Sequence, residues 1–313
     1  DFFYNDSPTT EPYPLSLHDA LPLSPKFLFG TKVNYSTDGY LNRYIALYDP
    51  IIHMWGRGVY SPKWISTHYT MLEIKYMEID PMHQIYQDAL QTLLEHEWKN
   101  HGLYNRHVHQ DMCVVGMLLS LACYGKSQDP KIAEMIDYIL DHTMSDGGWN
   151  CAWERKPSPK ISSVHTTLSV LEALHDVDQY GYTYRIKEVR MHMLSGIECL
   201  LKRNLYQAHG TKEAIHPSMA KASYPPRWKY DILRALEFLA SVKYPDNLRL
   251  TDAINTLISQ MKGPFMPKGS QISGLLHFKL EEGRYGMFNT LRMLKVLKHF
   301  RFPLYQKLIQ QEV

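Results

Sequence analysis

The sequence has no excess of charge of either sign. It carries 34 Lys and Arg against 32 Asp and Glu in 313 residues, a formal net charge of +2, and the basic residues are scattered along the chain. Binding to nucleic acid depends on a clustered basic surface, because neutralising phosphates supplies much of the affinity. We therefore exclude nucleic acid as a partner.

The sequence also lacks a long apolar run and a cysteine framework. Its longest uncharged apolar stretch, residues 114–123, is far shorter than the ~20 residues that span a bilayer. The four cysteines form no C-x-x-C pair, and so sparse a set favours reduced thiols over disulfides. We expect no transmembrane segment and a cytoplasmic location.

The N-terminal segment shows neither helical nor strand periodicity. Residues 1–24 contain four prolines, which exclude a regular helix or a central strand. The string resembles the translated read-through of a sequencing adapter, and it lacks the basic start and apolar centre of a secretory signal. We expect residues 1–25 to be disordered or artefactual, the native N-terminus to be missing, and residues 26–313 to form one domain.

From residue 60 onward the chain repeats one helical pattern. Five apolar stretches share a register: residues 69–72, 110–113, 165–168, 230–233 and 288–291. We call their second positions the anchors, and these are Thr70, Asp111, Thr166, Asp231 and Asn289. The spacing between anchors leaves room for two helices and their loops in each repeat.

Between these stretches lie segments that are apolar on one face only. They cover residues 82–98, 131–143, 185–205 and 247–261, with apolar residues at i, i+3, i+4 and i+7. The alternation of a uniformly apolar helix with a one-sided helix indicates an inner and an outer layer. No segment reads as several strands joined by hairpin turns, so the sequence predicts an all-α fold.

This alternation resembles the (α/α) toroids of the squalene cyclase and protein prenyltransferase β-subunit superfamily. Residues 146–151, Asp-Gly-Gly-Trp-Asn-Cys, are similar to its Gln-Trp repeat motif with Asp in the Gln place. The resemblance covers roughly residues 50–300. Four segments in particular are similar to a prokaryotic branch known only by this fold: residues 60–70, 163–173, 224–231 and 289–294. A complete toroid has one more inner helix than the five repeats here, which implies an N-terminally truncated (α/α) toroid.

Cyclases of this superfamily protonate an alkene with an Asp-x-Asp-Asp acid, whose proton is made labile by neighbouring carboxylates. The closest string here, Asp176-Val-Asp178-Gln179, lacks the third carboxylate and lies at the end of an inner helix. We expect both aspartates to be solvated at that helix end. Their spacing therefore argues against cyclisation.

Prenyltransferase β-subunits hold one zinc ion with an Asp-x-Cys and a His-Thr at the starts of two inner helices. Asp111-Met-Cys113 and His165-Thr166 match these patterns in the same order. The resemblance implies Asp111, Cys113 and His165 as ligands of a zinc ion that would activate a substrate thiolate. The candidate catalytic residues, all at inner-helix starts, are Asp111, His165, Tyr230 and Asp231.

Two alternatives use the same residues differently. Residues two apart on an ideal helix point about 200° from each other, so Cys113 also fits a small core residue and Asp111 a helix cap. In the second alternative, Cys151 replaces Cys113 as the ligand, with His109 nearby. Val114 stands where the superfamily has an aromatic residue, and no Gly-rich diphosphate motif precedes Asp111, which argues against recognition of an isoprenoid diphosphate.

Aromatic and basic residues gather at the predicted inner-helix starts. Such a mixture suits an apolar ligand with an anionic head. The alternative is that the aromatic residues lock the loops together and the cations lie at the surface. The cations are Lys63, Arg227, Lys229 and Arg284. The candidate ligand-binding residues are Trp64, Tyr69, Trp149, Trp153, Arg227, Trp228, Phe288 and Asn289, with Tyr230 beside them.

Three functional hypotheses follow. The first is a transferase or cyclase of this superfamily that acts on an isoprenoid in the toroid cavity, with zinc as a possible cofactor. The second is a protein that binds an apolar ligand in the same cavity without chemistry. The third is a scaffold that binds another protein, as helical repeats often do. The first depends most on the resemblance, and fold does not imply function.

Overall fold

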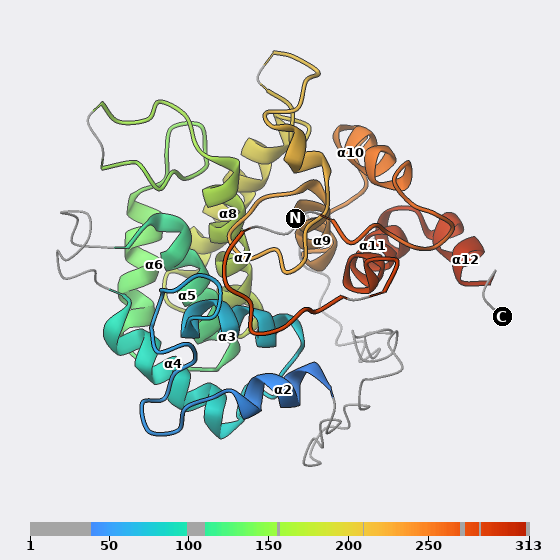
Figure 1. Cartoon of the computed structure of the whole chain (residues 1–313). Helices are drawn as coiled ribbons and strands as arrows, with labels where there is room; N and C mark the ends of the chain where they lie inside the picture. Colours follow the sequence, from blue (N-terminus) through green and yellow to red (C-terminus); the bar gives the residue numbers. More distant parts are fainter. Residues whose placement is uncertain are drawn as a thin grey trace.

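The computed structural model describes residues 39–98, 110–154, 157–208, 210–269, 273–281 and 283–310. Within these ranges the chain forms α-helices and one 3-10 helix, η1 (Pro217–Ala220), with isolated bridges but no β-strand (Figure 1). The predicted all-α class is confirmed. The segment expected to be artefactual, residues 1–25, lies outside the described residues.

Each of the five predicted repeats coincides with an inner helix. These helices are buried on nearly all sides; in the second of them, for example, only Cys113 and Tyr124 are not fully buried. Side chains cap two of the five at the N-terminus: Ser163 accepts from the Thr166 amide, and Asp231 accepts from the Arg234 amide. The inner helices are α3 (Thr67–Tyr76), α5 (Met112–Tyr124), α7 (Val164–Gln179), α9 (Ile232–Ser241) and α11 (Met287–Phe300).

The one-sided segments form the outer helices. They bury one face and leave the other to solvent, as their apolar periodicity predicted. Two helices were not predicted, α2 (Tyr40–Ala46) and α12 (Phe302–Gln310). The predicted outer helices are α4 (Gln84–His96), α6 (Lys131–Asp141), α8 (Ile186–Leu201) and α10 (Leu248–Ile258).

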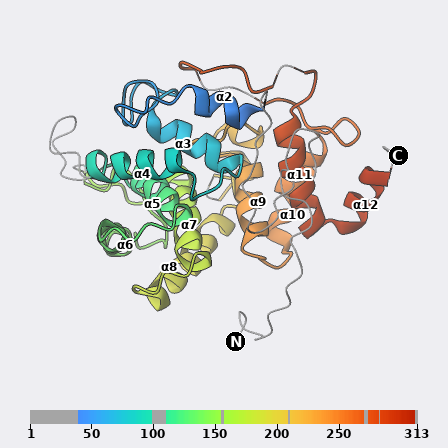
Figure 2. The same ribbon diagram turned by 90° about the horizontal axis from the view of Figure 1, so that it is seen from below.

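The inner helices follow one another along an arc, and the outer helices lie on its outer side (Figures 1 and 2). Residues 273–281 run back from the connection between α10 and α11 to the start of α3. There, the Trp64 amide donates to the Leu275 carbonyl at 3.0 Å, and the Leu275 amide donates to the Lys63 carbonyl at 3.0 Å. The predicted two layers are therefore present, while a closed (α/α) toroid stays a prediction.

The same set of hydrogen bonds connects an outer helix to the inner helix that follows it at two places, and we call this set of contacts a joint. The amide of Trp55 donates to Thr67 Oγ1 at 3.1 Å, and the amide of Trp149 donates to Thr167 Oγ1 at 3.1 Å. Both indole N–H groups then donate to a carbonyl of the preceding outer helix, Tyr44 in α2 and Ile139 in α6. Thus α2 is the outer helix of the first repeat.

The closest helix packing lies between α5 and α7. A Cβ atom added at Gly116 would lie 2.8 Å from the Ser169 carbonyl oxygen and 3.2 Å from the Val170 Cα. These are backbone atoms, so a larger residue would push the two helices apart. Gly116 therefore brings α5 against α7 at the centre of the inner layer.

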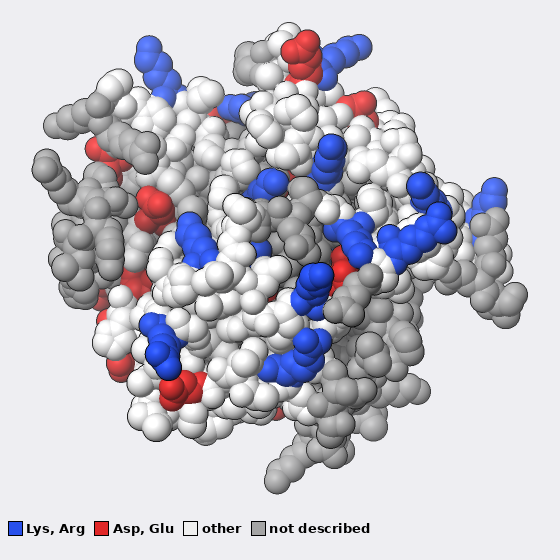
Figure 3. Space-filling view, viewed as in Figure 1, with Lys and Arg blue, Asp and Glu red and all other residues white. Residues whose placement is uncertain are grey.

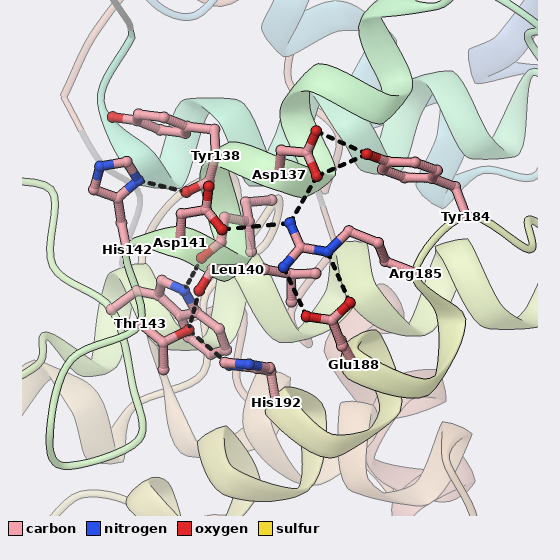
Figure 4. Close-up of polar contacts among 12 residues, drawn as sticks. Asp137, Tyr138, Leu140, Asp141, His142, Thr143, Tyr184, Arg185, Glu188 and His192 are labelled. Atoms are coloured by element: carbon pink, nitrogen blue, oxygen red, sulfur yellow. Dashed lines mark hydrogen bonds and ion pairs between the residues drawn. The ribbon is translucent and has the colours of Figure 1, made fainter.

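The outer helices α6 and α8 are connected at the surface by Arg185, the N-cap residue of α8 (Figure 4). Its guanidinium lies 2.7 Å from Asp137 Oδ1, 3.3 Å from Asp141 Oδ1 and 2.7 Å from Glu188 Oε2. Tyr184 donates to the same Asp137 carboxylate. Because these groups are partly exposed, the cluster connects the two helices but adds little to the free energy of unfolding.

No helix in the described parts of the chain is both long and apolar enough to cross a membrane.

Candidate functional site

The inner helices leave a cavity of about 160 Å³ between α3, α5, α7 and α9, which we call the central chamber. Three apolar side chains, Leu72, Met117 and Phe238, form part of its wall. The rest of the wall is polar or charged, and it consists of Lys75, Tyr76, Ser120, Ser169, Glu172, His175, Asp176, Arg234 and Glu237.

Ion pairs across the chamber wall connect successive inner helices. Arg234 of α9 donates to both carboxylate oxygens of Glu172 in α7, at 2.8 and 2.5 Å. Arg292 of α11 donates from Nε to Glu237 Oε2 of α9 at 2.7 Å. Both arginines are buried, so these charge-assisted hydrogen bonds compensate for desolvation of the guanidinium groups.

Asp176 corrects the expectation of a solvated helix end. It is buried, and its Oδ2 lies 2.5 Å from Lys75 Nζ of α3 and 2.5 Å from Ser120 Oγ of α5. The last turns of α7 lie against α3 and α5 rather than solvent, which places this carboxylate in the chamber wall. Asp178 points elsewhere, to an ion pair with Arg190 at 2.9 Å.

The chamber was not predicted, although the sequence contains a signal for it. Polar residues recur three and six positions after three of the anchors. The two positions lie on one side of a helix, and the structure turns most of them toward the chamber. The pairs are Glu73 and Tyr76, Ser169 and Glu172, and Arg234 and Glu237.

Three of the predicted ligand-binding residues lie together at the start of α3. The Arg227 guanidinium lies 4.6 Å from the centre of the Trp64 ring and 2.9 Å from Glu73 Oε1. Tyr69 packs edge-on against Trp64 and donates to the hydroxyl of Tyr60 at 2.8 Å. The cavity beside Trp64 and Arg227 measures only about 20 Å³, which leaves room for about one water molecule.

Two further predicted residues, Trp149 and Trp153, make structural contacts. Trp149 is fully buried in the joint between α6 and α7. Trp153 donates from Nε1 to the Tyr138 hydroxyl at 2.9 Å, and its ring lies 3.8 Å from that of His142. These contacts match the alternative in which tryptophans lock the loops together.

The remaining predicted ligand-binding residues lie around the starts of α9 and α11. Phe288 stacks on Tyr224 with ring centres 4.1 Å apart. Asn289 is fully buried and donates to the carbonyls of Pro267 and Lys268 at 3.3 and 3.0 Å. Trp228 is half-buried, and its Nε1 has no hydrogen-bond partner among the described residues.

Cys113 and Cys151 form a thiol pair at the start of α5. The backbone N–H of Cys113 donates to Cys151 Sγ at 3.2 Å, and Thr166 Oγ1 lies 3.2 Å from the same sulfur. The hydrogen bond between the two thiols lowers the pKa of Cys151 and raises that of Cys113 well above its usual value. Both residues are half-buried rather than enclosed in the core.

His165 faces α9 and contacts its start. Its Nδ1 accepts the Tyr230 amide at 2.9 Å, and its ring lies 5.5 Å from that of Trp228. With Nδ1 accepting, the ring proton lies on Nε2. Burial, together with the charges of Arg234 and Lys229, lowers the pKa of His165 to about 4. Tyr230 is fully buried, and its hydroxyl donates to the Leu205 carbonyl at 2.7 Å.

The two anchor aspartates differ. Asp111 is exposed at the N-cap of α5, and its side chain makes no capping hydrogen bond. Asp231 is fully buried, and besides capping α9 it accepts the Ser223 amide at 3.1 Å. Burial raises its pKa.

The residues implied as zinc ligands do not form a ligand set. No group of three His, Cys, Asp or Glu side chains that could hold a metal occurs in the described ranges. His165 is engaged with Tyr230, while Cys113 is paired with Cys151. His109, expected near Cys151, lies outside the described residues. We derive no step through a metal, and zinc stays a prediction from the resemblance.

A buried His–Glu pair was also missed by the sequence analysis. His68 Nδ1 lies 2.8 Å from Glu97 Oε1, and both side chains are fully buried between α3 and the end of α4. The sequence offers no signal for this pair, because the two residues belong to different helices.

The described part of the face in Figure 3 carries basic side chains singly or in small groups between uncharged residues. This distribution agrees with the scattered basic residues of the sequence.

Comparison of the chain with protein-family models, with curated proteins and with solved structures gave no significant match.

Proposed function

We propose that this protein binds a small polar molecule in the central chamber. The observation that carries the proposal is the chamber wall, in which charged and hydroxyl side chains from α3, α5, α7 and α9 converge on one cavity. Pockets with a few convergent polar groups and shifted pKa values are the usual sites of ligands.

The volume restricts the size of the ligand. Pockets for drug-sized molecules start at about 300 Å³, and a cavity of about 150 Å³ accommodates a molecule as large as benzene. The central chamber, at about 160 Å³, therefore suits a molecule of that order. A long isoprenoid chain exceeds this volume.

Three groups in the wall are available to a ligand. The hydroxyl of Tyr76 and the ring of His175 have no hydrogen-bond partner within the described ranges, and Glu237 uses only Oε2 with Arg292. Burial lowers the pKa of His175, so its neutral ring offers one donor and one acceptor. A phenol, an imidazole and a carboxylate oxygen together suit a ligand with hydroxyl or amino groups.

The first test is a ligand screen. We would measure the Tm of the purified chain with a panel of monosaccharides, polyols, amino acids and small amines, and determine the Kd of any hit by calorimetry. Binding to the native state raises the Tm. The proposal would fail if no compound of these classes bound.

A substitution then locates the site. Tyr76→Phe removes a hydroxyl that has no described protein partner, so we expect the unliganded protein to keep its stability. Loss of one ligand hydrogen bond should weaken the Kd about ten-fold, equivalent to about 1.4 kcal/mol. Tyr184→Phe, at an exposed tyrosine that does not line the chamber, is the control and should bind as the parent does. Equal Kd values for both variants would show that the ligand binds outside the chamber.

The isoprenoid hypothesis remains a proposal based on the resemblance alone. The volume of the central chamber, about 160 Å³, is too small for a long isoprenoid chain. Extraction of an isoprenoid from the purified protein would support that hypothesis over the polar ligand.

A further inference from the structure

A thiol pair lies at the N-terminal end of α5, about one turn before Met117, the first residue of this helix in the chamber wall. Cys113 is in the first turn of α5, and Cys151 is in the loop that leads from Trp149 to α7. Ser120, which lines the chamber, is seven residues further along α5. The pair is thus separate from the proposed ligand site.

The geometry points to Cys113 and Cys151 as an oxidisable dithiol that forms a reversible disulfide. The Cys151 sulfur lies 3.2 Å from the backbone nitrogen of Cys113, although 37 residues separate the two cysteines in the chain. A disulfide brings two sulfurs to about 2 Å. Because the Cys151 sulfur already lies against the backbone of Cys113, rotation of the Cys113 side chain is enough to approach it. Neither residue is fully buried, in contrast to Cys123 and Cys199.

Cys151 is placed to react first. Its sulfur accepts the backbone N–H of Cys113 and lies beside the Thr166 hydroxyl. Donors of this kind at a helix N-terminus favour a nucleophilic sulfur. Cys113, whose backbone lies against that sulfur, is then placed to resolve the product.

The oxidant that we name is a hydroperoxide. The Cys151 sulfur attacks one peroxide oxygen and breaks the O–O bond, which leaves a sulfenic acid on Cys151 and releases water, or an alcohol from an organic peroxide. The Cys113 sulfur then attacks the sulfenic sulfur, forms the S–S bond and expels the hydroxyl group as a second water. Both thiol protons leave in these products, the peroxide is reduced, and the thiol pair is oxidised.

The other two cysteines provide an internal comparison. Cys123 is fully buried in α5 with burial raising its pKa, and Cys199 is buried beside the Ser162 hydroxyl at 3.0 Å. Neither has a cysteine neighbour. Oxidation should therefore be confined to Cys113 and Cys151.

The experiment treats the reduced full chain with hydrogen peroxide, then measures free thiols and the intact mass. We expect the thiol count to fall from four to two and the mass to fall by two hydrogen atoms, with a peptide cross-linked between positions 113 and 151. Dithiothreitol should restore the starting mass. Zinc should be absent from the untreated protein, because a thiolate-bound metal would protect both sulfurs.

Variants separate the roles of the two sulfurs. Cys113→Ser should leave a sulfenic acid on Cys151 that dimedone traps, whereas Cys151→Ser should lose peroxide reactivity. Cys199→Ser is the matched control and should form the cross-link as the parent does. Circular dichroism checks that each variant is folded. Over-oxidation without a cross-link, an unchanged thiol count in peroxide, or stoichiometric zinc lost with either cysteine would overturn the inference.

Discussion

At the scale of single residues, the position of His165 shows how burial sets its protonation. The ring accepts a backbone amide from the start of α9 and lies near Arg234 and Lys229, so a second ring proton is unfavourable. Its pKa is about 4 in the folded protein against 6.5 for an ordinary histidine. The unfolded chain therefore binds this proton more readily than the folded chain.

The free energy of unfolding therefore depends on pH. The contribution of His165 is present above pH 6.5 and is lost as the pH falls from 6.5 toward 4, with as much as about 3 kcal/mol at stake. His165→Asn retains an acceptor for the Tyr230 amide but does not titrate. Urea unfolding across this pH range should show a smaller loss of stability in the variant than in the parent, and parallel curves would contradict the assignment.

At the scale of the helix element, a repeated joint on a threonine hydroxyl positions the start of three inner helices, α3, α7 and α11. Trp149 and Trp55 occupy equivalent positions, and in both joints a threonine hydroxyl in the first turns of the inner helix accepts the tryptophan amide. The third joint, at the start of α11, uses Met266 and Thr290 at 2.8 Å. The joint thus needs the threonine hydroxyl more than it needs the tryptophan ring.

A substitution in the joint tests this role. Thr167→Val keeps the shape of the side chain and leaves the buried Trp149 amide without its acceptor, which should cost about 1–3 kcal/mol of unfolding free energy. Thr167→Ser restores the hydroxyl and should recover most of that loss. Denaturant unfolding measures both. A valine variant as stable as the serine variant would show that the hydrogen bond does not matter.

At the scale of the whole molecule, buried ion pairs connect segments that are far apart in sequence. Glu73 and Arg227 are 154 residues apart, yet Arg227 donates to Glu73 Oε1 from both Nε and Nη2, at 3.0 and 2.9 Å. Tyr44 of α2 donates to the other carboxylate oxygen. These contacts bring α2, α3 and the segment before α9 together on the inner side of the arc.

Breaking this pair on one side should be costly. Glu73→Gln leaves the buried Arg227 charge uncompensated, and we expect a loss of about 3–5 kcal/mol. The double variant Glu73→Leu with Arg227→Met removes both charges and should lose less. A double-mutant cycle from urea unfolding gives the coupling energy, and additive effects would indicate that the two side chains act independently.

The candidate site was predictable only in part. The anchors located the inner-helix starts, and the loop motif pointed to Trp149 and Cys151, which the structure places beside the start of α7 and against Cys113. The contacts that these residues make with other helices were not predictable. Asp176 illustrates the difficulty, because its sequence context is that of a solvated helix end, whereas Lys75 and Ser120 approach it from two other helices.

The sequence by itself determined the all-α class, the order of inner and outer helices, and the extent of the outer helices to within four residues at each end. Helical periodicity is a property of residues three and four apart, so a single segment contains it. Only the tertiary structure decided that the inner layer holds a chamber lined with charges, that Cys113 meets Cys151, and that His165 faces α9. Those outcomes depend on side chains from distant segments, whose charges, hydrogen bonds and burial exist only once the helices have packed.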